Sequence, residues 1–175
     1  MNFNVKNISS YEKAHQSFIS SMSFNPKEED ILASACNINN NIADDRTIKL
    51  WRVSESGLTP LNENKLHLFG VNALQWNSEG LLLASGGNDC NLNIFDVNRG
   101  KLNRNFRLDS PVTCVDFNFS SNLILVGTYD NQILLYDVRS KNIISQILAH
   151  SEPITSVYFS GDSTVMLSSS YDGFW

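Results

Sequence analysis

A six-residue apolar frame, with apolar residues at its first, fourth and sixth positions, occurs four times along the chain. Its copies are Ile19-x-x-Met22-x-Phe24, Val71-x-x-Leu74-x-Trp76, Val112-x-x-Val115-x-Phe117 and Ile154-x-x-Val157-x-Phe159. A second apolar run that ends in small residues follows each copy, and then a turn with an aspartate. The turn aspartates are Asp45, Asp89, Asp130 and Asp172, spaced by 44, 41 and 42 residues. The pattern predicts an internal repeat of about 42 residues.

The apolar segments within each repeat predict short β-strands. They are rich in Val, Ile, Leu and aromatic residues and are bounded by Asn, Asp, Gly and Ser, and no helical apolar period extends beyond about one turn. We expect a fourth strand per unit at residues 65–69, 101–108 and 142–148. Each unit is then a four-stranded antiparallel sheet, and about 42 residues is the size of a propeller blade. The fold class is predicted to be all-β.

The units divide the chain unevenly. We expect an N-terminal segment at 1–14 and units at about 15–69, 70–108 and 109–148, with an incomplete unit at 149–175. The 175 residues therefore hold about three and a half four-stranded blades. Closed propellers have roughly four to eight blades, so the apolar faces at both ends are expected to be open. We predict a partial propeller, or one that completes its ring with another copy or a partner.

Composition narrows the class of protein. The 13 Lys and Arg against 18 Asp and Glu give a net charge of −5, which argues against direct nucleic-acid binding. Three cysteines without C-x-x-C spacing argue against a disulfide framework or a zinc site. No apolar stretch approaches the length of a membrane span. We therefore expect an intracellular protein of the nucleus or cytoplasm, with no cofactor, metal or membrane contact.

The three histidines, His15, His67 and His150, each lie four residues before a frame. The set of His15, Ser34 and Asp45 superficially matches a hydrolase triad. A nucleophilic site needs one exposed serine with an oxyanion hole, whereas this set recurs from unit to unit. The repetition favours a structural role, and no catalytic residue is predicted.

The order His, V-x-x-V-x-F, L-A-S-G, Asp and I-x-L-W/F/Y-D resembles the WD40 repeat from His15 to Trp175. The resemblance implies a β-propeller, most often with seven blades in the parent protein. It also implies a buried tetrad in which the histidine bridges the turn aspartate and a strand hydroxyl that meets a Trp indole. The residues so assigned are His15, Ser34, Asp45, Trp51, His67, Asp89, Asp130, His150 and Asp172. Only the first unit has all four residue types, because Phe95 and Tyr136 replace Trp and Leu108 replaces His.

The resemblance also implies three positions per blade around the channel mouth. They are Ser20, Asn72, Thr113 and Thr155; Phe18, Gly70, Pro111 and Pro153; and Asp44, Asn88, Tyr129 and Tyr171. Tyr129 and Tyr171, beside Pro111 and Pro153, are the predicted peptide anchors, because tyrosine buries a large area at small entropic cost. The alternative is that tyrosine merely fits a strand end. The net charge, with Asp44 and Glu152, favours an Arg- or Lys-containing peptide.

The segments 149–159 and 168–173 are similar to the WD-repeat scaffold subunits of COMPASS-type histone lysine methyltransferase complexes. This resemblance implies a non-enzymatic scaffold of a chromatin complex that takes an arginine-bearing peptide. Those subunits clamp arginine between aromatic rings, whereas this chain has Asn72 and Thr113 at corresponding positions. The alternatives are an adaptor in RNA processing, ubiquitin ligation or trafficking, and a propeller hydrolase.

Overall fold

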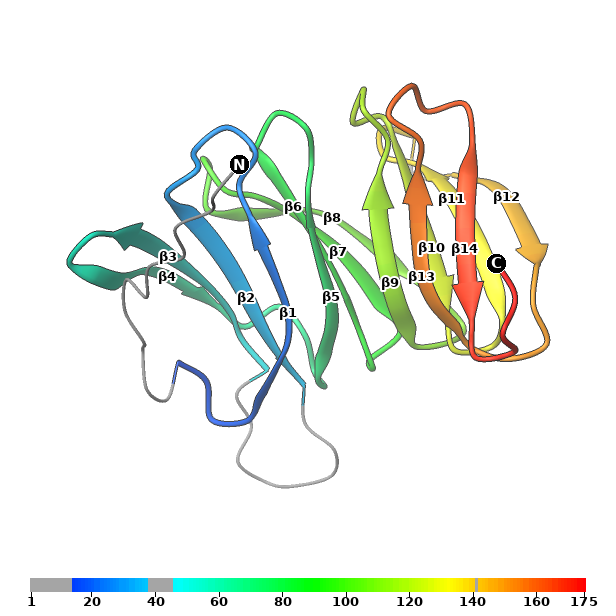
Figure 1. Ribbon diagram of the computed structural model, residues 1–175, viewed down its shortest axis with the longest axis horizontal. Helices are drawn as coiled ribbons and strands as arrows, with labels where there is room; N and C mark the ends of the chain where they lie inside the picture. The colour runs from blue at the N-terminus through cyan, green and yellow to red at the C-terminus, as the bar shows by residue number, and fades with distance from the viewer. Residues whose placement is uncertain (1–13, 38–45, 141) are drawn as a thin grey trace, which may run out of the picture.

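The computed structural model describes residues 14–37, 46–140 and 142–175. Within these ranges the chain forms fourteen β-strands and no helix, which confirms the predicted all-β class. They form three four-stranded sheets and one two-stranded sheet, each antiparallel and in chain order (Figure 1). The described part of the chain is therefore an incomplete β-propeller.

The first sheet contains β1 (Phe18–Phe24), β2 (Ile31–Asn37), β3 (Ile48–Ser54) and β4 (Gly57–Asn64). The second contains β5 (Val71–Trp76), β6 (Leu82–Gly87), β7 (Asn91–Asp96) and β8 (Lys101–Arg107). The third contains β9 (Val112–Phe117), β10 (Leu123–Thr128), β11 (Gln132–Asp137) and β12 (Ile143–Leu148). The fourth contains β13 (Ile154–Phe159) and β14 (Met166–Ser170).

The outer strand of the first sheet differs from the prediction. The strand expected at residues 65–69 is wrong, because β4 lies at Gly57–Asn64 and residues 65–69 connect it to β5. β4 carries Pro60 opposite Trp51. Proline cannot donate a hydrogen bond to a strand ladder, and an outer strand tolerates this because it pairs on one side only.

The apolar core lies between the sheets. The frame residues Val71, Leu74 and Trp76 of β5 form one cluster with Ala33 and Ala35 of β2. The frames of β9 and β13 likewise belong to clusters that include residues of the preceding sheet. The inner strands β1, β5, β9 and β13 therefore lie side by side.

Small residues on the second strand of a sheet make room for the frame of the next. A Cβ atom added to Gly86 would lie 2.2 Å from Cγ1 of Val112, and one added to Gly127 would lie 2.6 Å from Cγ2 of Ile154. Both distances are far below van der Waals contact. This close approach explains why the apolar run in each repeat ends in small residues.

The sheets present two sets of turns at opposite ends of their strands (Figure 1). Turns between the first and second strands, at 25–30, 77–81, 118–122 and 160–165, form the first-turn face, toward which the arrowheads of β1, β9 and β13 point. Turns between the second and third strand positions, at 88–90, 129–131 and 171–173, form the second-turn face. The corresponding turn of the first sheet falls at 38–45, outside the described residues.

Candidate protein-binding face

The second-turn face repeats one backbone contact. The N–H of Asn88 donates to the carbonyl of Gly70 at 2.9 Å, that of Tyr129 to Pro111 at 3.0 Å, and that of Tyr171 to Pro153 at 3.2 Å. Each bond joins the residue before the turn aspartate to the rim residue before the inner strand of the same sheet. The backbone of each turn is thus held to its rim.

Tyr129 and Tyr171 carry exposed rings on these held turns. Their exposed fractions are 62% and 76%, whereas Asn88 at the equivalent position of the second sheet is half-buried. Pro111 and Pro153 are half-buried beside them. Two adjacent sheets therefore present a tyrosine at the same place, with the backbone already ordered. Asp44, the equivalent residue of the first sheet, lies outside the described residues.

The inner-strand residues predicted around the channel mouth are Asn72, Thr113 and Thr155, and their role on this face differs from that of the two tyrosines. The side chain of Asn72 accepts a hydrogen bond from Asn37 Nδ2 at 2.6 Å and donates to Asn88 Oδ1 at 2.8 Å and to the Val112 carbonyl at 2.7 Å. These bonds link the first, second and third sheets, so the Asn72 amide is occupied within the protein. Thr113 is half-buried, and exposed Thr155 contacts Ser169 at 2.8 Å.

Histidine networks join loop and sheet in the second and fourth sheets. His67 contacts Asp89 Oδ1 through Nδ1 at 2.9 Å and Ser85 Oγ through Nε2 at 2.8 Å. His150 makes the same pair of contacts with Asp172 Oδ2 and Ser168 Oγ, both at 2.9 Å. Ser85 and Ser168 were not among the residues that the sequence predicted for the tetrad. Their alignment with Ser34 after an apolar run could have identified them.

In the first sheet, the histidine network includes a tryptophan that donates to the strand serine. His15 Nε2 lies 2.7 Å from Ser34 Oγ, and Trp51 Nε1 donates to the same oxygen at 2.8 Å. His15, Ser34 and Trp51 are all buried. Asp45, the fourth predicted member, lies outside the described residues.

The third sheet replaces the histidine network with apolar packing and a local turn. Leu108, which stands in place of histidine, is buried in the core cluster between the second and third sheets. Asp130 instead accepts hydrogen bonds from Thr128 Oγ1 at 2.5 Å and from Gln132 Nε2 at 2.9 Å. The aspartate is thus satisfied by residues within two positions of itself.

The network lowers the pKa of its carboxyl groups. Burial alone raises the pKa of Asp89, but hydrogen bonds from His67, the Leu68 N–H and Asn91 outweigh it and lower the pKa from 3.8 to about 2. The pKa of Asp172 is also lowered, because the effect of burial is outweighed by hydrogen bonds from neighbouring N–H groups and His150. Both carboxyl groups are therefore ionised at neutral pH.

The contacts of Ser85, His67 and Asp89 follow the order of a hydrolase triad. A nucleophile must reach its substrate, yet Ser85 is 1% exposed and the two side chains beside it are buried. In the fourth sheet, Ser168 borders a cavity of about 480 Å³ that Trp175 also lines. That sheet has no described third strand of the kind that places Trp51 against Ser34. The recurrence of the contacts favours a structural role.

Among the described residues, no group of three or more His, Cys, Asp or Glu side chains is arranged to hold a metal ion. The same part of the chain has no helix long and apolar enough to cross a membrane.

Antiparallel four-stranded sheets that stack through their inner strands define a β-propeller repeat protein. The family model described as the anaphase-promoting complex subunit 4 WD40 domain matches residues 22–120 and 107–162. The chain belongs to the WD40-repeat family.

Several curated proteins are similar to this chain. COMPASS component SWD3 of Saccharomyces cerevisiae is 30% identical over 108 residues, covering 61% of this chain and 34% of that protein. Histone acetyltransferase type B subunit 2 of Candida glabrata is 28% identical over 155 residues, covering 85% of this chain and 35% of that protein. Pre-mRNA-processing factor 19 of Bos taurus is 24% identical over 150 residues, with coverages of 84% and 28%. The chain thus spans about a third of the length of these relatives.

Proposed function

We propose that the chain is a non-catalytic WD40 scaffold that binds peptides or proteins through its second-turn face, with Tyr129 and Tyr171 as the anchors. The observation that supports this most is the pair of exposed rings on equivalent turns of adjacent sheets. Because each turn is already bonded to its rim, burying a ring requires little further ordering of the backbone.

The charge of the chain supports a basic partner. The net charge is −5, and Glu152 is exposed next to Pro153 on the rim of the same face. Complementary charge speeds association and selects among partners more than it raises affinity. The partner that fits best is an Arg- or Lys-containing peptide, with the tyrosine rings supplying buried area.

The names of the relatives support two settings. A COMPASS component and a histone acetyltransferase subunit favour a chromatin complex in the nucleus. A pre-mRNA-processing factor favours the alternative, an adaptor in RNA processing. The chromatin setting agrees with the resemblance of segments 149–159 and 168–173, and we propose it first.

The anchor proposal is tested with a library of fluorescent peptides that contain arginine or lysine. We expect Tyr129→Ala combined with Tyr171→Ala to weaken the tightest interaction at least about tenfold, because truncating a central aromatic anchor costs about 2 kcal/mol or more. The matched control is Tyr158→Ala, which removes an exposed ring from β13 away from these turns. Anisotropy titrations with unchanged affinity in the double variant would remove the proposal.

We also propose that the two open ends of the sheet stack pair with each other in a second copy of the chain. The frame of β1 is exposed, and Leu167 on β14 is exposed where its counterparts Ala33, Ala84 and Leu125 are buried. In the three interfaces described above, such a frame packs against such a second strand. A head-to-tail contact between copies would repeat that packing.

Sedimentation velocity tests this pairing. We expect the unmodified chain to show a concentration-dependent increase in sedimentation coefficient that Met22→Lys abolishes, since the substitution places a charge in the proposed contact. Leu61→Lys on β4 is the control, because Leu61 is exposed on an outer strand outside the frame. A chain that stays monomeric at tens of micromolar contradicts self-association and leaves the tyrosine proposal unaffected.

A further inference from the structure

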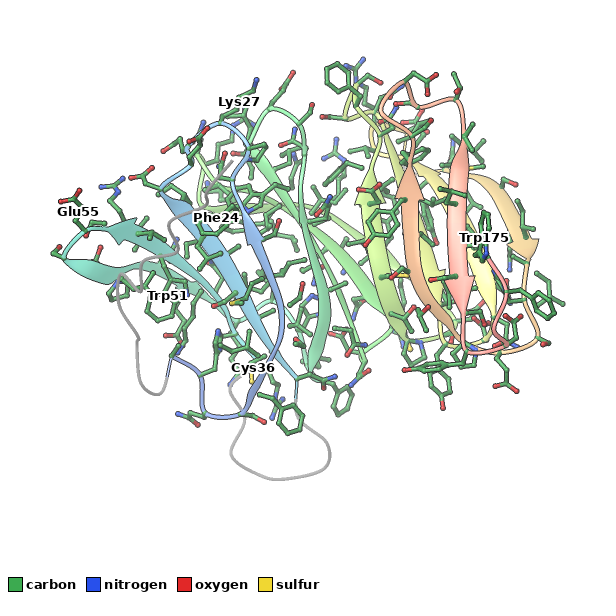
Figure 2. All side chains as sticks on the ribbon, in the orientation of Figure 1. Phe24, Lys27, Cys36, Trp51, Glu55 and Trp175 are labelled. Carbon is green, nitrogen blue, oxygen red and sulfur yellow. The ribbon has the colours of Figure 1, made fainter. Side chains whose placement is uncertain are left out.

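A cavity of about 320 Å³ opens on the first-turn face, opposite the two tyrosines. It lies where the inner strands β1, β5, β9 and β13 of the four described sheets end. Its lining includes Ser23, Phe24, Gln75, Trp76, Asp116 and Phe119. Phe24 stands at the end of β1 that bears this face (Figure 2). The cavity thus combines aromatic side chains with one carboxylate.

Asp116 on β9 is that carboxylate, and among the described residues it has no counter-ion. Its side chain accepts one hydrogen bond per oxygen, from Gln75 Nε2 at 2.9 Å and from the Phe159 N–H at 2.7 Å. Both donors are neutral, and among the described residues no Lys, Arg or His forms an ion pair with it. Asp116 is only 7% exposed, and burial raises its pKa above the ordinary range. A desolvated carboxylate of this kind is stabilised most by a cation.

The repeat does not require a charge at this position. Asp116 directly precedes the last aromatic residue of its frame, and the equivalent residues are Ser23, Gln75 and Tyr158. All three are neutral, and each lies on an inner strand that pairs antiparallel with the second strand of its sheet, as Asp116 does. The acid at position 116 therefore belongs to this cavity and not to the blade pattern.

The aromatic side chains complement a cation with an alkyl stem. Phe24 and Phe119 both line the cavity with largely exposed rings. The backbone of Phe119 is held on both sides, by Ser78 Oγ at 2.6 Å and by Ser163 Oγ at 3.1 Å. Aromatic faces attract ammonium and guanidinium groups and pack against the methylenes that carry them.

We propose that this cavity binds the cationic side chain of an arginine or lysine from a partner chain. Asp116 pairs with the charge, while Phe119, which lies outside the apolar frames, packs on the stem. The site is separate from the tyrosine pair, because the two lie at opposite ends of the strands. A partner could therefore contact both faces, or two partners could bind at once.

The test is an NMR titration with N-acetyl-arginine amide and N-acetyl-lysine amide. Their neutral counterparts, N-acetyl-citrulline amide and N-acetyl-norleucine amide, have similar shape without the charge. We expect the cationic probes to bind at least about tenfold more tightly than the neutral ones, with shifts at Asp116 and Phe119. Asp116→Asn should abolish this preference, because asparagine keeps an oxygen for the Phe159 N–H and loses the charge.

Two control variants make the outcome decisive. Glu29→Gln removes an exposed carboxylate that does not line the cavity from the turn 25–30 of the same face and should leave the preference intact. Tyr129→Ala with Tyr171→Ala should also leave it intact. Equal affinity for charged and neutral probes, or a preference that survives in folded Asp116→Asn, overturns the inference. Loss of the preference in the tyrosine variant would place the cation on the second-turn face and overturn it as well.

Discussion

The frame of β5 and the frame of β1 have the same apolar pattern and opposite environments. Val71, Leu74 and Trp76 are between 0% and 5% exposed, whereas their counterparts in β1 are 44% to 61% exposed. Both strands pair within their own sheets with the same antiparallel order. The frame is therefore a contact between sheets, and the presence of a preceding sheet decides whether it is buried.

The largest expected effect is on the free energy of unfolding. It comes from replacing the last frame residue with alanine in β5 and, for comparison, in β1. Trp76→Ala should lower the free energy of unfolding by about 3–5 kcal/mol, because it leaves a cavity and removes the hydrogen bond from Nε1 to the Ser23 carbonyl. Phe24→Ala should lower it by less than about 1 kcal/mol. Urea unfolding at a concentration where the chain is monomeric measures both. Equal losses would show that Phe24 is buried in the folded monomer and would break the comparison.

A second, smaller contrast lies between His67 and Leu108, which occupy the same register in the second and third sheets. His67→Leu should leave Asp89 and Ser85 without their ring partner and lower the free energy of unfolding by about 1–3 kcal/mol. Leu108→His should also destabilise, because Val126 stands where the serine partner would be. Thermal unfolding should show midpoints lower by several degrees for both. If His67→Leu leaves the free energy of unfolding unchanged, the hydrogen-bond chain adds nothing to stability.

The smallest expected effect is a pH dependence confined to acid. The pKa of Asp89 is lowered from 3.8 to about 2 by folding, so its contribution to stability is complete above about pH 4 and is lost as pH falls toward 2. The difference in unfolding free energy between the unmodified chain and Asp89→Asn should therefore shrink over this window. A difference that stays constant from pH 6 to pH 2 would contradict a lowered pKa.

Sequence predicted the inner strands well and one outer strand poorly. An inner strand carries an apolar frame because it packs on a neighbouring sheet. β4 needs no such pattern, since it is an outer strand with mostly exposed side chains, and its Pro60 argues against a strand. The apolar residues Leu66 and Phe69 lie in the following segment, and the strand was predicted there, directly after the end of β4.

The residues of the candidate sites also divide into those that the sequence predicts and those that it does not. The equivalence of Tyr129 and Tyr171 follows from counting within the repeat, and so does the register of the histidines. The contacts of Asn72 with Asn37 and Val112, and those of Asp116, do not, because these partners come from neighbouring sheets. The cavity beside Asp116 likewise has a wall formed by residues of four sheets. Such contacts depend on how blades stack, which no local pattern encodes.

The amino-acid sequence by itself determined the repeat, the all-β class and the WD40 resemblance, because periodic burial leaves a periodic apolar pattern. Only the tertiary structure decided which frames are buried, which polar side chains are occupied between sheets, and that Asp116 is enclosed beside aromatic rings. The physical reason is that each blade encodes its own strands, whereas burial, desolvation and pairing of charge arise where one blade meets the next.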